Sequence, residues 1–354
     1  MKSKTKQNAP TIGEWKRLYE LAAELKKLAP WEWMDETEIF GVENPDTKEI
    51  GFVSPMGMMG EHLSIGVYLG AEGLYGFWDF QEVGLEAEPF ALFEIPQLQV
   101  SFENRESLEK QDRETIKQLD LKFRGSQNYP LFRSIRPGFM PWFITSEEAR
   151  FLIYAIEQTL EVAPRVRENP DILIDESDTE NEVCLVRSAD ETNGKINWRD
   201  EMREIAPPAE KEFIVQIPQT LIDELKAFPQ VRNLILEIDL FYAPTPVGER
   251  GKRPYIPKML MLADNRSGMI AGFQIIQPKE NEIENYTEIS RHLFDLLHKL
   301  NARPQEIRVA SDDLFDLLKG INQQLNIKLR QTEDLQAIEA AKEGMFGFFG
   351  GSLF

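Results

Sequence analysis

The sequence predicts a two-domain protein, with an N-terminal α+β domain built on an antiparallel sheet with flanking helices and a C-terminal α/β domain. Three observations lead to this prediction. The chain has 354 residues, which suits two domains of roughly 150 residues each. Its first part carries short segments rich in aromatic and β-branched residues, separated by turn residues, as antiparallel sheets do. Its last part alternates such segments with helical patterns, in the order β-β-β-α-β-α-β-α.

Two capping boxes indicate the helices at the two ends of the N-terminal domain, which we place at residues 1–164. Thr11 and Glu14 precede apolar residues that recur at helical spacing, so the chain is expected to begin with an amphipathic helix. Thr145 and Glu148 repeat the same spacing before a second amphipathic run. This second helix is expected to close the domain.

Short strands are expected between these two helices. Each candidate combines aromatic and β-branched residues and is bounded by Gly, Pro, Asn or Asp. The expected strands cover residues 38–42, 50–54, 63–69, 75–80 and 98–102. A charged run over residues 107–119 predicts a surface helix.

Residues 165–211 are expected to form an acidic connector that carries a β-hairpin. The sequence here loses helical periodicity, and two apolar segments flank an Asn-Gly pair at residues 193–194, a strong hairpin signal. A Pro-Pro pair at residues 207–208 then precedes a new pattern. The second domain is therefore assigned to residues 212–354.

The second domain shows its elements clearly, because apolar runs alternate with helical patterns and turn residues separate them. Strands are expected over residues 234–243, 257–263, 269–277, 306–310 and 327–330. Helices are expected over residues 287–300, 312–319 and 332–345.

The amino-acid composition argues against several kinds of partner and site. The chain has 40 Lys+Arg and 60 Asp+Glu, a net charge of −20, so its overall field disfavours nucleic acid and anionic membranes as partners. One cysteine excludes an intrachain disulfide and any zinc site built from cysteines. No window approaches the length of apolar sequence that a membrane span needs. We expect a cytoplasmic protein that does not enter the membrane.

Three segments of the second domain carry a resemblance to a known fold: Leu236-Glu-Ile-Asp-Leu240, Leu262-Ala-Asp-Asn-Arg-Ser-Gly268 and Arg308-Val-Ala-Ser-Asp312. Together with the element order, they resemble the ribonuclease-H-like fold of integrase and transposase cores. That resemblance implies a meander of three strands followed by two parallel strands reached through helices.

Motifs spread over most of the chain carry a second resemblance. Two examples from the N-terminal domain are Pro30-Trp-Glu-Trp-Met34 and Pro137-Gly-Phe-Met-Pro-Trp142. With these motifs the whole chain resembles an uncharacterised family of bacterial two-domain proteins, and this resemblance implies no activity.

Carboxylates of the second domain could hold metal ions. Glu237 and Asp239 alternate with apolar residues, so both project from one face of the first strand. The ribonuclease-H-like resemblance implies that Asp239 occupies the place of the first catalytic Asp, with Asp312 (or its neighbour Asp313) as the second metal ligand and a carboxylate of the last helix, Glu339 or Glu343, as the third. Three such acids would hold Mg²⁺ or Mn²⁺ for phosphodiester hydrolysis. Alternatively, Asp312 follows Ser311 at a helix start and only stabilises that terminus.

A segment without any acidic residue runs from Leu121 to Phe143, here named the basic-aromatic segment. Cations and aromatic rings interleaved in this way can grip an acidic ligand or stack on bases. Alternatively, the rings pack in the core and the cations pair with carboxylates of the same chain. The candidate binding residues are Lys122, Arg124, Tyr129, Arg133, Arg136 and Trp142.

These observations favour a non-catalytic binding or protein-interaction module that needs no cofactor. Its expected partner is a protein or an acidic ligand, as the basic-aromatic segment suggests. The alternative is a metal-dependent nuclease or nucleotidyl-transfer enzyme that uses Asp239, Asp312 and Glu339 with Mg²⁺ or Mn²⁺.

Overall fold

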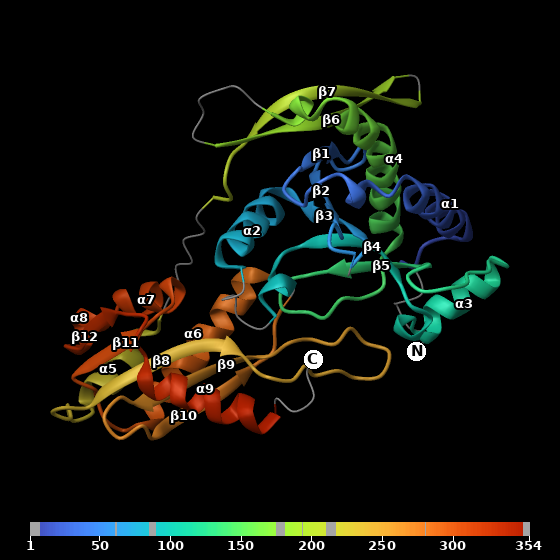
Figure 1. Ribbon diagram of the computed structural model, residues 1–354. Helices are drawn as coiled ribbons and strands as arrows, with labels where there is room; N and C mark the ends of the chain where they lie inside the picture. Colours follow the sequence, from blue (N-terminus) through green and yellow to red (C-terminus); the bar gives the residue numbers. More distant parts are fainter. Residues whose placement is uncertain are drawn as a thin grey trace. The chain divides into compact units, whose positions relative to one another are not determined.

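The computed structural model describes residues 8–60, 62–84, 90–174, 181–192, 194–209, 217–279 and 281–349, apart from the side chains of 346, 348 and 349. The chain forms two compact units, whose elements are labelled in Figure 1. Unit 1 comprises Met1–Pro137 and Pro141–Ala209, and unit 2 comprises Gly138–Met140 and Glu210–Phe354.

Unit 1 contains a seven-stranded sheet in the order β5-β4-β3-β2-β1-β6-β7. Its strands are β1 (Phe40–Glu43), β2 (Ile50–Met56), β3 (Ser64–Leu69), β4 (Gln97–Glu103), β5 (Tyr129–Ile135), β6 (Glu182–Thr192) and β7 (Lys195–Ile205). Neighbouring strands are antiparallel except β1 and β6, which run parallel with Gly41 opposite Val186. The sheet is therefore mixed and not purely antiparallel, because a long helical crossover leads to β6 and permits parallel pairing.

Helices cover both faces of this sheet (Figure 1). They are α1 (Ile12–Leu28), α2 (Gly70–Val83), α3 (Lys110–Gln118) and α4 (Ser146–Glu168), with short 3-10 helices η2 (Pro30–Glu32), η4 (Ala91–Glu94), η5 (Arg105–Ser107) and η6 (Pro170–Leu173). Both capping boxes are confirmed: Thr11 caps α1 and Thr145 caps α4 through reciprocal bonds with the Glu three residues later.

Alternating side chains divide the core of unit 1 between the two sheet faces. Val53 and Val67 pack with α1 and α4 on one face, whereas Phe52 and Tyr68 pack with α2 on the other. On the first face, Gly51 lets α4 approach closely, because a Cβ there would lie 2.8 Å from the Phe151 ring.

One aromatic segment does not form the structure that its residue types favour. Residues 75–80, expected as a strand, lie in α2, where Leu74 and Phe77 share one buried face at helical spacing. Here tertiary packing decides between two periods that a short aromatic run allows. The strand β5, in the basic-aromatic segment, is not among the expected strands, although its residue types favour one.

Residues 165–211 differ from the separate connector that the sequence predicts. The helix α4 continues to Glu168, and the hairpin β6–β7 joins the sheet of unit 1 through the β1–β6 pair. Six consecutive residues of β6, Cys184–Ala189, are buried. The hairpin itself is present, with Thr192 opposite Lys195, while Asn193 lies outside the described residues.

Unit 2 contains a five-stranded sheet in the order β10-β9-β8-β11-β12. Its strands are β8 (Ile235–Tyr242), β9 (Lys258–Asp264), β10 (Ile270–Ile276), β11 (Glu306–Val309) and β12 (Lys328–Gln331). The first three form an antiparallel meander, and β11 runs parallel to both β8 and β12. The helices are α5 (Gln219–Ala227), α6 (Glu282–Lys299), α7 (Asp312–Lys319), α8 (Asn322–Leu325) and α9 (Gln336–Phe349).

The two faces of the second sheet carry separate apolar clusters. Leu236 and Leu262 pack with α6 and α7 on one face. Met259 and Met261 pack on the other face with Ile338 of α9. The helix α9 therefore lies over the same face of β8 from which Glu237 and Asp239 project.

Candidate functional site

The carboxylate of Glu237 lies at the N-terminus of α9 and is completely buried. One of its oxygens, Oε2, accepts hydrogen bonds from the backbone nitrogens of Ala337 (2.7 Å) and Ile338 (3.1 Å). The other oxygen accepts a bond from the side-chain amide of Asn265. Glu237 therefore satisfies amides that the first turn of a helix leaves free, and its negative charge suits the positive end of the helix dipole.

Asp239, two residues along β8, forms an ion pair with Lys342 of α9. Lys342 Nζ lies 2.7 Å from Asp239 Oδ2 and 3.0 Å from Glu339 Oε1. It also lies over the ring of Phe241, 4.9 Å from the centroid. Burial lowers the pKa of Lys342, but hydrogen bonds and charge from Asp239 and Glu339 outweigh it, so the pKa lies above its ordinary value. The ammonium is a cation held between two carboxylates.

Asp312 makes its contacts elsewhere. It lies at the start of α7, where Ser311 caps the helix, and its Oδ1 accepts a hydrogen bond of 2.5 Å from the side chain of Gln331, at the end of β12. Glu343 is exposed on α9. The structure thus brings Asp239 and Glu339 together through Lys342. Among the described residues, no three His, Cys, Asp or Glu side chains form a group that could hold a metal ion.

Arg133 of the basic-aromatic segment is buried and paired within the chain. Its Nη1 and Nη2 donate to the two carboxylate oxygens of Asp112 in α3, at 2.9 and 2.7 Å. Its guanidinium also lies over the Phe143 ring, 4.7 Å from the centroid. This planar two-bond pair joins α3 to β5 and leaves Arg133 inaccessible to a ligand.

The other candidate binding residues differ in whether they contact residues of the same chain or are exposed. Arg136 bonds the Glu148 carboxylate at 3.1 Å, and the Tyr129 hydroxyl donates to a backbone carbonyl. The Trp142 ring contacts the Phe143 ring edge-on. Lys122 and Arg124 are exposed, and within the described residues neither contacts a carboxylate. Lys122 and Arg124, in the loop between α3 and β5, are thus exposed cations of the segment that no described carboxylate neutralises.

Glu148 provides a pH-dependent link between β5 and α4. Burial raises its pKa, but hydrogen bonds from the Thr145 backbone and the Ser134 hydroxyl, with the charge of Arg136, outweigh it and hold the pKa below its ordinary value. A carboxylate with a depressed folded-state pKa stabilises the fold above its unfolded pKa. That contribution is lost as the pH falls through the folded-state pKa.

We therefore expect Glu148→Gln to reduce the acid sensitivity of unit 1. The urea midpoint followed by tryptophan fluorescence should fall less between about pH 7 and about pH 3 in the variant than in the wild type. Gln keeps the capping position at the third residue of the helix, so only the charge is removed. The control is Glu147→Gln, an exposed carboxylate in the same turn. Equal pH dependence in wild type and Glu148→Gln would contradict this expectation.

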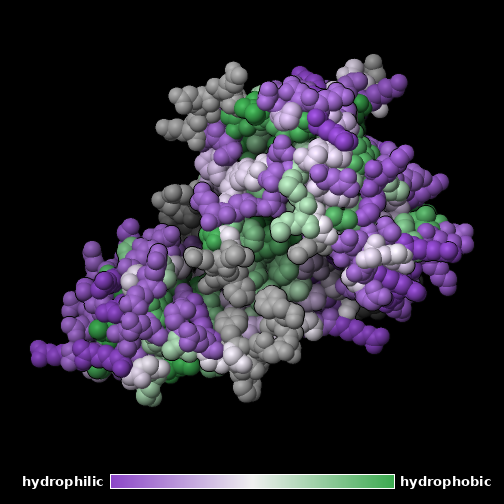
Figure 2. Space-filling view, viewed as in Figure 1, coloured by the Kyte–Doolittle hydropathy of each residue, from purple (hydrophilic) through white to green (hydrophobic). Residues whose placement is uncertain are grey.

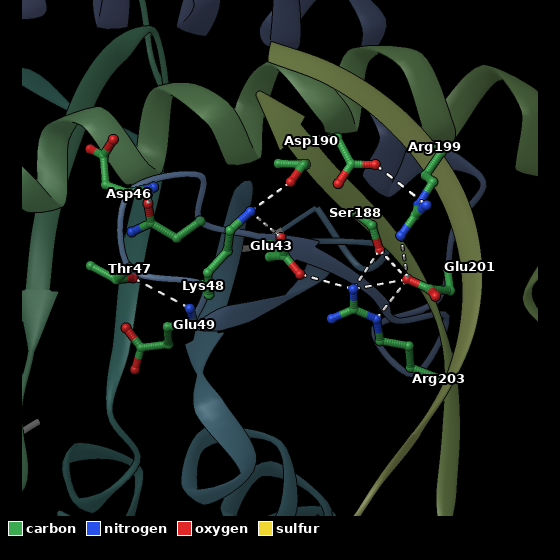
Figure 3. Close-up of polar contacts among 12 residues, drawn as sticks. Glu43, Asp46, Thr47, Lys48, Glu49, Ser188, Asp190, Arg199, Glu201 and Arg203 are labelled. Carbon is green, nitrogen blue, oxygen red and sulfur yellow. Dashed lines mark hydrogen bonds and ion pairs between the residues drawn. The ribbon is translucent and has the colours of Figure 1, made fainter. Parts of the chain in front are cut away.

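Figure 3 shows a further polar cluster in unit 1, around the buried carboxylate of Glu43. Lys48 Nζ lies 2.9 Å from one oxygen and Arg203 Nη2 lies 2.9 Å from the other. Burial raises the pKa of Glu43, but hydrogen bonds from Lys48 and Arg203 outweigh it and leave the pKa below its ordinary value. The two cations thus stabilise ionised Glu43 at the end of β1.

The same cluster extends across the β6–β7 hairpin (Figure 3). Arg203 donates to Glu201 at 2.9 Å and to the Ser188 hydroxyl at 2.8 Å, and that hydroxyl donates to Glu201 at 2.6 Å. Lys48 also donates to the carbonyl of Ala189. Cations and carboxylates are paired with one another here, so the cluster fastens the hairpin to β1 and the turn that follows it. Sequence reasoning missed this cluster, because it depends on the parallel β1–β6 pair.

Comparison with known proteins gives two matches. Residues 15–187 match the model of a domain of unknown function, DUF7309, and residues 221–346 match the model of another, DUF6930. The chain thus carries two adjacent domains of unknown function, as its resemblance to an uncharacterised two-domain family implies. No curated protein and no solved structure matches the chain. No helix within the described ranges is long and apolar enough to cross a membrane.

Proposed function

We propose that the chain is a non-catalytic binding protein whose second unit has a ribonuclease-H-like scaffold. The sheet order of unit 2 supports the scaffold, because a meander of three antiparallel strands is followed by two strands that run parallel to the first. The position of Lys342 supports the absence of catalysis. Its ammonium holds Asp239 and Glu339, two of the three carboxylates that a nuclease would use.

The residues around Asp239 do not suit a divalent metal. A cation between two carboxylates supplies the positive charge that Mg²⁺ or Mn²⁺ would bring, and a metal ion would first have to displace it. Glu237, the other acid on this face of β8, is engaged by backbone amides of α9 and a side-chain amide.

The accessible cations support an acidic ligand for unit 1. Lys122 and Arg124 lie in one exposed loop of a chain whose net charge is −20. The overall negative field of such a chain repels a carboxylate-rich partner. A local basic site is therefore the feature that would attract one.

Titration calorimetry with Mn²⁺ tests the proposal. We expect no stoichiometric binding by the wild type and none by Asp239→Asn, since Lys342 already neutralises this site. A matched assay incubates both proteins with Mn²⁺ and single- or double-stranded DNA, and we expect no cleavage above the level of a protein-free control. Stoichiometric Mn²⁺ binding by the wild type that Asp239→Asn removes, or DNA cleavage that it removes, would overturn the proposal in favour of the metal-dependent nuclease.

A further inference from the structure

The chain between β2 and β3 carries methionine side chains on a tight turn. Residues 56–62 read Met-Gly-Met-Met-Gly-Glu-His. The amide of Gly60 donates to the carbonyl of Gly57 at 2.8 Å, so Met58 and Met59 occupy the two central positions of a β-turn. Met58 is 55% exposed and Met59 is 90% exposed, whereas most of the surface visible in Figure 2 is hydrophilic. The turn thus presents thioether groups that a ligand can reach.

Glycine at position 57 lets this loop close against His62. Gly57 has a φ of +127°, a conformation that residues with a side chain rarely adopt. A Cβ at this position would lie 2.8 Å from the carbonyl oxygen of His62. The backbone of Gly57 therefore passes directly beside His62. Its two neighbours in the sequence, Met56 and Met58, are held close to that histidine.

Met56 and Ser64 lie opposite one another on β2 and β3, so their side chains share one face of the sheet. The methyl carbon of Met56 lies 3.0 Å from the place that a Cβ would take on Gly66. Ser64 is completely buried, and its hydroxyl has no hydrogen-bond partner among the residues that the structure describes. A buried hydroxyl without a partner is costly. A further group bound at this end of the sheet face would therefore complete the structure.

The imidazole of His62 lies over the same sheet face. Its Nε2 is 3.2 Å from the side-chain nitrogen of Gln99, which lies opposite Gly66 in the β3–β4 pair. The side chains of His62 and Met56 therefore both reach the neighbourhood of Gly66. The other ring nitrogen, Nδ1, lies 3.6 Å from the Glu103 carboxylate. A carboxylate beside Nδ1 favours the proton on that nitrogen and leaves Nε2 as the basic one, as in histidines that bind metal ions.

We propose that the thioethers of Met56 and Met58 and the Nε2 atom of His62 bind one soft monovalent cation, Cu(I). Thioether sulfur selects Cu(I) over hard metal ions, and imidazole suits copper as well. Methionine has an unbranched side chain with three rotatable bonds, so the two thioethers can turn towards the imidazole. Met59 is given no part in the site, because its side chain is almost wholly exposed.

The charge of the donors distinguishes this site from the divalent metal site considered for unit 2. All three donors are uncharged, whereas Mg²⁺ and Mn²⁺ prefer oxygen ligands such as carboxylates. The net charge of −20 attracts cations to the chain. The inference goes beyond the proposed function and uses neither the Lys342 ion pair nor the basic-aromatic segment.

Calorimetric titration of the full-length protein with Ag⁺ in a chloride-free buffer tests this site, because Ag⁺ is a soft monovalent ion like Cu(I) and is stable in air. We expect the wild type to bind Ag⁺ with a stoichiometry of one. Met58→Leu and His62→Gln should each weaken binding at least about tenfold, because each removes one donor. Both side chains are more than half exposed, so neither substitution should disturb the fold.

Two controls separate this site from other sulfur atoms of the chain. Met269→Leu removes an exposed thioether from unit 2 and should leave Ag⁺ binding unchanged. Cys184→Ala should also leave it unchanged, because the thiol is buried and burial raises the pKa of Cys184 to about 12, so the reactive thiolate is scarce.

The methyl signals of the methionines identify the sulfur ligands directly. In protein labelled with ¹³C at the methionine methyl groups, Ag⁺ should shift the signals of Met56 and Met58, each assigned by substitution with Leu. The Met269 signal should stay in place, and the Met59 signal should shift less than that of Met58.

Three results would overturn the inference. The first is a wild type that binds no Ag⁺, and the second is Ag⁺ binding that Met58→Leu and His62→Gln both leave unchanged. The third is binding that Cys184→Ala abolishes, which would assign the ion to the thiol. None of these results affects the test of the proposed function, which uses Mn²⁺ and Asp239.

Discussion

Replacing Lys342 with Met is expected to destabilise unit 2 by about 3–5 kcal/mol. Asp239 is 7% exposed, and without the ammonium its carboxylate would stay buried with no opposite charge. Met has a similar length and can still pack over Phe241, so the loss comes mainly from the uncompensated charge. Urea unfolding followed by circular dichroism measures this effect.

Comparing tryptophan fluorescence with circular dichroism shows which unit the substitution destabilises. All six lie in unit 1, at Trp15, Trp31, Trp33, Trp78, Trp142 and Trp198. Fluorescence therefore follows unit 1, whereas circular dichroism follows both units. Lys342→Met should move the transition seen by circular dichroism and leave the fluorescence transition in place.

The double variant Lys342→Met/Asp239→Asn should recover at least half of the lost stability, because it removes the unpaired charge as well. Glu339→Gln, at the exposed end of the same cluster, should change stability by less than about 0.5 kcal/mol. A loss in Lys342→Met that the second substitution leaves unchanged would mean that packing, and not charge, explains the effect.

The sequence predicts best those features that a few neighbouring residues determine. Thr11 with Glu14 and Thr145 with Glu148 form both predicted caps, because each bond joins residues three positions apart. The alternation that places Glu237 and Asp239 on one face of β8 is equally local, since it follows from the strand period.

Features that depend on distant pairings were not predictable in this way. The partner of Asp239 is a lysine on the last helix, far from Asp239 in the sequence. The hydrogen-bond donors to Glu237 are backbone amides, which nearly every residue type has, so the residue types do not reveal them. The Lys48–Glu43–Arg203 cluster requires β6 to lie beside β1. The sequence does contain one local indication of this ion pair. Lys342 follows Glu339 by three residues, a spacing that places a cation beside a carboxylate on the same helix face.

Glu237→Ala is expected to destabilise unit 2 by about 3–5 kcal/mol. The substitution leaves the amides of Ala337 and Ile338 buried without their acceptor and removes a negative charge from the N-terminus of α9. It also leaves a cavity beneath the helix. Circular dichroism should show the earlier unfolding, and hydrogen exchange should show faster exchange of these two amides.

Glu237→Gln separates the hydrogen bonds from the charge. Its amide oxygen can still accept from α9, so the loss should be smaller, about 1–2 kcal/mol. Glu343→Gln removes an exposed carboxylate from the same helix and should alter neither stability nor exchange. If Glu237→Gln were as damaging as Glu237→Ala, the charge would account for the whole effect. If Ala337 and Ile338 exchanged at the wild-type rate in Glu237→Ala, Glu237 would not be the residue that holds the first turn of α9.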